Sequence, residues 1–123
     1  MNHYDPERAP NPEEWLALDD STRIQLVEQY HRSARVKLPN VKAHSAFHAI
    51  VENQLAGRLE PVVRAMARLT KEGLTRHDVV HAIASVVAKQ VYNMSNGKVD
   101  AENSQANYLA DVEKLTARSW LSG

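Results

Sequence analysis

The apolar residues of this chain recur at intervals of three and four positions, which is the spacing of an amphipathic α-helix. Ile24, Val27 and Tyr30 follow this spacing. They indicate a helix that begins near Ser21 and ends before Leu38. No segment alternates apolar and polar residues with a period of two, and the chain holds only 4 glycines. The pattern therefore predicts an all-α protein.

Residues that commonly cap the N-termini of helices precede three of the later helical segments. These caps are Asn40, Thr75 and Asp100. Pro61 stands where the first turn of a further helix tolerates proline, and that helix is expected to end near Gly73. We therefore expect about five helices, joined by short loops that favour antiparallel helical hairpins.

The N-terminal segment differs from the rest of the chain. Residues 1–12 carry three of the chain's 5 prolines and no periodic apolar pattern, so we expect an extended arm that packs, if at all, through Tyr4. A chain of 123 residues suits one hydrophobic core rather than two. Residues 1–123 are accordingly predicted to form a single helical domain.

A histidine pattern occurs twice, at positions 33 residues apart. His44-Ser-Ala-Phe-His48-Ala-Ile and His77-Asp-Val-Val-His81-Ala-Ile each place two imidazoles one helical turn apart. With this spacing two side chains can bind one metal ion. Glu52 extends the first copy by another turn. We therefore predict a site for one divalent transition metal, either zinc, iron, nickel or manganese, with these ligands: His44, His48, Glu52, His77 and His81.

The repetition also bears on the architecture, because helical repeat proteins are built from two-helix units of about this length. A two-fold repeat would place a histidine-bearing helix first in each of two hairpins. Those two helices would then run parallel, and their histidine pairs would lie at similar heights.

Several roles remain open for these residues. Glu52 is the one candidate for a catalytic base, acting on a metal-bound water in a metal-dependent hydrolase; alternatively it forms an ion pair with Arg58. The histidines could instead be hydrogen-bond partners between helices in a non-catalytic interaction module. His31 is expected to cap the end of its helix, with a role as an additional ligand as the alternative.

The charge balance, the lack of cysteine and the absence of long apolar runs limit which partners and which cellular location we expect. The chain has 15 Lys+Arg, 15 Asp+Glu and no cysteine, so neither a polyanionic partner nor a disulfide framework is indicated, and nucleic-acid binding is not expected. No apolar run is long enough to span a bilayer, and the acidic, polar N-terminus does not resemble a secretory signal. We expect a cytoplasmic protein without membrane contact, whose partner is a second copy in a homodimer or another protein.

Two stretches of the sequence carry a resemblance to a known group. Glu52-Asn-Gln-Leu-Ala56, one turn after His48, and Arg76-His77-Asp-Val-Val-His81-Ala-Ile83 resemble a family of small bacterial proteins of unknown function. That family has a His-x-x-x-His-x-x-x-Glu-Asn-Gln stretch and an Arg-His-x-x-x-His-Ala-Ile stretch. The resemblance covers about residues 15–95. It implies an all-helical fold and a bacterial cytoplasmic setting, and it implies no activity.

Overall fold

Helices make up the fold in the part of the chain that the computed structural model describes, residues 1–34 and 40–122. They are α1 (Pro12–Ala17), α2 (Asp20–Ser33), α3 (Val41–Ala56), α4 (Glu60–Lys71), α5 (Arg76–Ser95), α6 (Ala101–Lys114) and α7 (Ala117–Ser122). The all-α prediction is confirmed, and the five predicted helices correspond to α2–α6. Leu38 and Pro39, before which the first long helix was expected to end, lie outside the described residues.

The predicted N-caps are confirmed. The side chains of Asn40, Thr75 and Asp100 each accept a hydrogen bond from the backbone N–H three residues later, at 3.0, 3.2 and 2.8 Å. Such a bond satisfies one of the backbone donors that a helix start leaves without a partner. These contacts fix where α3, α5 and α6 begin, and two of those helices carry the paired histidines.

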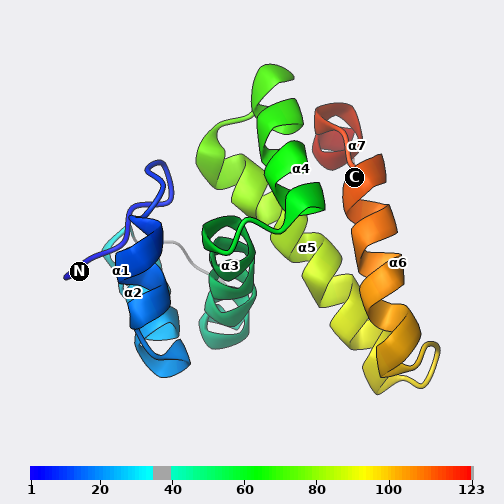
Figure 1. Cartoon of the computed structure of the whole chain (residues 1–123), viewed down its shortest axis with the longest axis horizontal. Coiled ribbons are helices and arrows are strands. Elements are labelled where there is room, and N and C mark those ends of the chain that lie inside the picture. Colours follow the sequence, from blue (N-terminus) through cyan, green and yellow to red (C-terminus); the bar gives the residue numbers. More distant parts are fainter. Residues whose placement is uncertain (35–39, 123) are drawn as a thin grey trace.

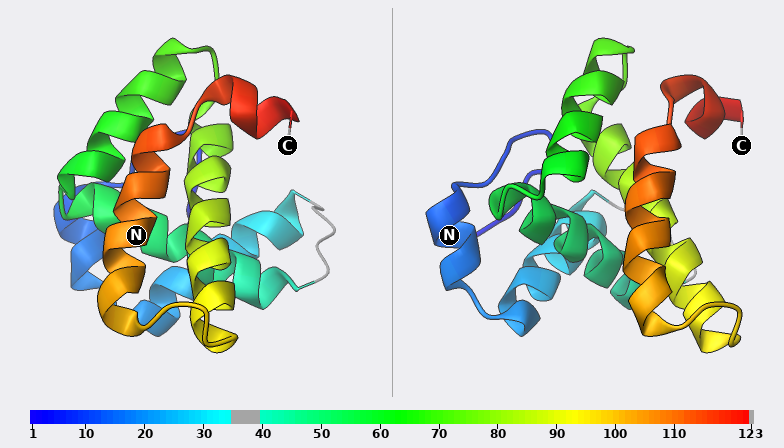
Figure 2. Two further views of the ribbon diagram at one scale, coloured as in Figure 1. Left: turned by 90° about the vertical axis from the view of Figure 1, so that its right-hand side faces the viewer. Right: turned by 45° about the vertical axis from the view of Figure 1, so that its right-hand side comes forward.

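Helix α3 lies at the centre of the molecule and packs against α1, α2, α4 and α5. In Figure 1 it is seen nearly end-on, whereas α5 and α6 run across the view. The two histidine-bearing helices therefore cross steeply instead of running parallel. Helices α5 and α6 form the expected antiparallel hairpin, as Figure 2 shows, but α3 and α4 also cross at a steep angle.

Two hydrophobic clusters stabilise this arrangement, and α3 contributes to both. Val51 is fully buried in the larger cluster, which is formed mainly by α3, α4, α5 and α6. Ala49 is buried in the smaller cluster with Trp15 of α1 and Val27 of α2. Because α3 buries apolar residues on both sides, it is held firmly between α2 and α5. Among the described helices, none combines the length and apolar character that crossing a lipid bilayer requires.

The N-terminal arm packs against the helices and ends one residue earlier than expected, since α1 begins at Pro12. Tyr4 anchors it: this side chain is 3% exposed, and its ring centroid lies 5.7 Å from that of Trp15. The indole N–H of Trp15 in turn donates to Asn53 of α3 at 2.8 Å. The arm thus belongs to the smaller core and ends close to α3.

Candidate metal centre

Four imidazoles meet where α2, α3 and α5 pack together. His31 comes from the last turn of α2, His44 and His48 from the first half of α3, and His81 from the first half of α5. One ring nitrogen of each lies within 4.8 Å of those of the other three. We call these four residues the histidine cluster. The molecule is therefore a small helical protein with a histidine cluster that could hold a metal ion.

The distances inside the histidine cluster are close to those of a metal site. The ring centroids of His44 and His48, of His48 and His81, and of His44 and His81 are 4.6, 4.5 and 4.7 Å apart. The Nε2 atoms of His44 and His81 are 3.0 Å apart. Zinc–imidazole bonds of about 2.1 Å would place two tetrahedral ligands about 3.4 Å apart. Small movements of the rings would therefore suffice to surround an ion.

Burying the imidazoles of the histidine cluster costs free energy unless their nitrogens find a further partner. His31 and His48 are both 0% exposed. Within the described part of the chain, neither ring nitrogen of His48 has a hydrogen-bond partner, and neither does Nε2 of His31. A buried polar group without a partner costs about 1–3 kcal/mol. Buried imidazoles without partners, with one nitrogen of each close to the others, indicate a site for a ligand that accepts lone pairs.

The rings are held in the neutral form, which is the form that binds metals. Burial, together with the positive charge that neighbouring imidazoles would carry, lowers the pKa of His31 and of His81 from 6.5 to about 4. The same two causes lower the pKa of His48 still further, and burial lowers that of His44. Each ring therefore offers a lone pair at neutral pH.

These pKa values predict how the metal-free protein responds to acid. The unfolded chain takes up protons at its histidines near pH 6.5, whereas His31 and His81 of the folded protein take them up only near pH 4. The contribution of these neutral histidines to the free energy of unfolding is therefore fully present above pH 6.5 and is lost as the pH falls towards 4. The loss is about 1.4 kcal/mol per pH unit for each extra proton bound by the unfolded chain. Urea unfolding at pH 7.5, 6 and 5 measures this. Equal stability at pH 7.5 and 5 would contradict the assignment of neutral, buried rings.

His77, the remaining predicted histidine, borders the histidine cluster. Its ring centroid lies 4.3 Å from that of His81 and 5.6 Å from that of His48. Its backbone N–H donates to the carboxylate of Glu7 in the arm at 3.0 Å, and its Nε2 is buried without a partner in the described part of the chain. It is not one of the four residues whose nitrogens lie within 4.8 Å of one another. His77 therefore neighbours the histidine cluster without belonging to it.

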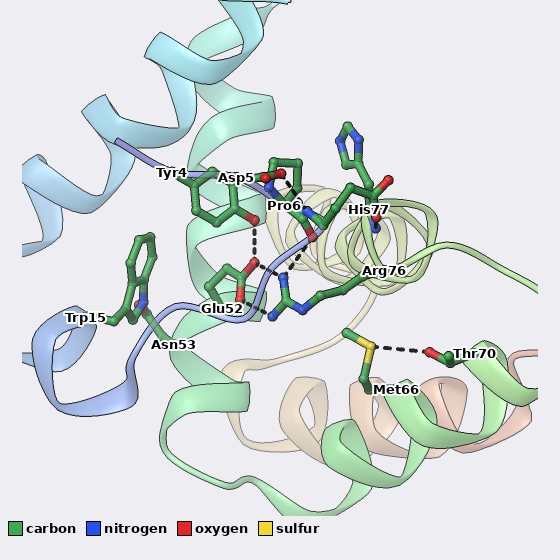
Figure 3. Close-up of polar contacts among 11 residues, drawn as sticks. Tyr4, Asp5, Pro6, Trp15, Glu52, Asn53, Met66, Thr70, Arg76 and His77 are labelled. Atoms are coloured by element: carbon green, nitrogen blue, oxygen red, sulfur yellow. Dashed lines mark hydrogen bonds and ion pairs between the residues drawn. The ribbon is translucent and has the colours of Figure 1, made fainter. Parts of the chain in front are cut away.

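Glu52 is directed to partners outside the histidine cluster. Its two carboxylate oxygens accept hydrogen bonds from the guanidinium of Arg76, at 2.7 and 2.8 Å, and one of them also accepts from the hydroxyl of Tyr4 (Figure 3). Arg76 donates in addition to the backbone carbonyl of Pro6 at 2.9 Å. The ring of His77, next along α5, points away from this ion pair. The carboxylate thus ties α3, α5 and the arm together.

The electrostatics of this contact are those of a closed ion pair. Glu52 is 1% exposed, and the Arg76 side chain 16%. Burial by itself lowers the pKa of Arg76, but the hydrogen bonds and negative charge of Glu52 outweigh this effect and raise it. Burial and the Glu52 charge raise the pKa of Tyr4 well above its usual value, so the phenol stays protonated and donates. The expected ion pair between Glu52 and Arg58 is wrong, since the partner is Arg76.

The structure thus brings together three of the predicted ligands, His44, His48 and His81, and places His31 with them. The helical pattern contained a signal for His31, because it follows the fully buried Val27 by four residues on the same face of α2. Arg76 and Tyr4 were not identified as partners of Glu52. Arg76 stands directly before His77, but the sequence gives no distance from it to α3.

No family model, curated protein or solved structure matches this chain. The resemblance to small bacterial helical proteins therefore stays a prediction, and the functional argument depends on the geometry of the histidine cluster alone.

Proposed function

We propose that this protein binds one divalent transition metal ion in the histidine cluster, with His31, His44, His48 and His81 as ligands. The observation that carries the proposal is His48: a fully buried imidazole with no hydrogen-bond partner for either nitrogen in the described part of the chain, surrounded by three other rings. A bound cation would provide a partner for one nitrogen of His48, the one that lies close to the nitrogens of the other three rings.

The donor set favours particular metals. Neutral imidazole nitrogens suit zinc, nickel and iron(II), whereas manganese prefers carboxylate and carbonyl oxygens. The four nitrogens come without a carboxylate, because both oxygens of Glu52 already bind Arg76. Among the four metals expected from the sequence, zinc, nickel and iron(II) therefore fit the cluster better than manganese.

The same contacts favour binding over hydrolysis. A hydrolase needs a base beside the metal-bound water, and Glu52 was the one candidate for that role. Its engagement with Arg76 and Tyr4 supports a structural role instead, in which it stabilises the packing of α3, α5 and the N-terminal arm.

The competing function is an interaction module whose histidines only hydrogen-bond between helices. The 3.0 Å contact between His44 and His81 and the 3.4 Å contact of His31 Nδ1 with the Ser45 hydroxyl fit this alternative. The buried nitrogens of His48 do not, because hydrogen-bonded core histidines have partners. Metal uptake separates the two functions.

Metal addition is expected to raise the thermal stability of the protein. Zinc or nickel at about 100 times its dissociation constant would add about 2.7 kcal/mol. For a chain of this size the melting temperature would rise by roughly 10 °C. Differential scanning calorimetry of chelator-treated protein measures the shift, with magnesium as the control because it prefers oxygen ligands. Equal melting curves with zinc, nickel and magnesium would favour the interaction module.

Replacing His31 and replacing His77 should differ in their effect on metal affinity. His31→Ala removes a ring of the histidine cluster and is expected to weaken zinc binding by more than about tenfold, whereas His77→Ala removes a neighbour and should change it by less than about tenfold. Competition with a chromogenic chelator gives both affinities. A larger loss in His77→Ala than in His31→Ala would mean that the ligand set is the one predicted from the sequence.

A further inference from the structure

A hollow opens beside the histidine cluster. Its volume is about 260 Å³, and both His44 and His81 line it. These are the two half-buried members of the cluster, whereas His31 and His48 are fully buried. An ion in the cluster would therefore be closed off on the side of His31 and His48 and be nearest to solvent on the side of the hollow.

The rest of the hollow is mainly apolar. Phe47 of α3, Ala84 and Ala88 of α5 and Trp120 of α7 form its wall. The one hydroxyl in the lining belongs to Ser85, and it already donates to the carbonyl of Ala82 at 2.6 Å. Apart from the two histidines, no lining residue can carry a charge. A ligand in this hollow would meet a metal ion at one end and apolar side chains elsewhere.

Charge balance decides the kind of ligand. Four neutral imidazoles leave the full double positive charge on a divalent ion. The negative charge of Glu52 does not compensate it, because that carboxylate is paired with Arg76. An anion that reaches the ion from the hollow would be attracted by this uncompensated charge in a setting of low dielectric. The volume, below that of pockets for drug-sized ligands, suits a short body such as one aromatic ring.

We propose that the hollow is a binding site for a small monocarboxylate with an apolar body, whose carboxylate becomes a fifth ligand of the metal ion held by the histidine cluster. The apolar part of this ligand lies against Phe47, Ala88 and Trp120. This inference rests on the proposed metal binding, and it adds the ligand class that the metal site would recognise.

Cobalt(II) allows the two proposals to be tested separately, because its visible absorption bands report both metal binding and a change of ligands. The protein is first titrated with cobalt and then with benzoate or acetate. Benzoate is expected to change the cobalt spectrum at saturation and to bind at least tenfold more tightly than acetate, because its ring is buried in the hollow. Ala88→Leu fills the hollow and should weaken benzoate at least tenfold while cobalt still binds. Ala110→Leu, the same substitution on the exposed face of α6, is the matched control.

Failure of each proposal gives a different result. Protein that takes up no cobalt would overturn the metal site and the carboxylate site with it. Protein that binds cobalt, but whose spectrum benzoate leaves unchanged or shifts with the affinity of acetate, would overturn the carboxylate site alone. Equal benzoate affinity in Ala88→Leu and Ala110→Leu would do the same. The comparison of benzoate with acetate in the unaltered protein decides the matter if Ala88→Leu does not fold.

Discussion

Replacing His48 and His81 together with alanine is expected to abolish zinc binding. The two rings come from different helices and have centroids 4.5 Å apart, so their removal takes half of the proposed ligands and leaves no donor from α5 among the four. Loss of a residue that merely orients a ligand costs about 10–100-fold in affinity, so loss of two ligands should exceed about 100-fold. Competition with a chromogenic chelator measures this change.

The chain provides a matched control for this experiment. His3 is the sixth histidine, lies exposed in the arm and is not part of the histidine cluster. His3→Ala should keep the full affinity and a stoichiometry of one ion per chain. Zinc binding that survives in the double variant, or that disappears in His3→Ala, would show that zinc does not bind in the histidine cluster.

Replacing Glu52 with glutamine should strongly destabilise the protein and leave its metal affinity nearly unchanged. The substitution removes the negative charge that compensates the largely buried guanidinium of Arg76. Breaking a buried ion pair in this way costs about 3–5 kcal/mol, because one charge stays buried without its partner. Urea unfolding measures the loss, and chelator competition on the folded variant should find zinc affinity within about tenfold of the unaltered protein.

Two further variants show whether this loss comes from the buried ion pair. Glu113 pairs with Arg64 at 2.7 Å on the surface, where both side chains are 53% exposed, so Glu113→Gln should cost less than about 1 kcal/mol. Adding Arg76→Leu to Glu52→Gln should restore part of the stability, since no unpaired charge is then buried. A Glu52→Gln variant that stays stable but loses zinc would instead make Glu52 a ligand, as the sequence pattern predicted.

The helices could be predicted from the sequence because their signals are local. Asn40, Thr75 and Asp100 cap helices through their own side chains, and the apolar spacing of three and four positions is a property of each segment alone. The histidine pairs could be recognised for the same reason, since positions four apart share a helix face. These features needed no knowledge of how the helices pack.

Tertiary packing decided what the sequence left open. The crossing of α3 and α5 is set by the apolar residues that each helix buries, and a 33-residue repetition does not contain that angle. The steep crossing still brings His48 and His81 together, because both pairs lie in the first halves of their helices. Glu52 was assigned to the metal because it continues the histidine face, but Arg76 and Tyr4, distant in sequence, engage it.

Anomalous X-ray scattering from crystals of the zinc-loaded protein tests the central claim most directly. We expect one peak per chain among His31, His44, His48 and His81, about 2.1 Å from one nitrogen of each coordinating ring. Peaks found only on surface residues, or a cluster of histidines without a peak at saturating zinc, would contradict the proposed metal site.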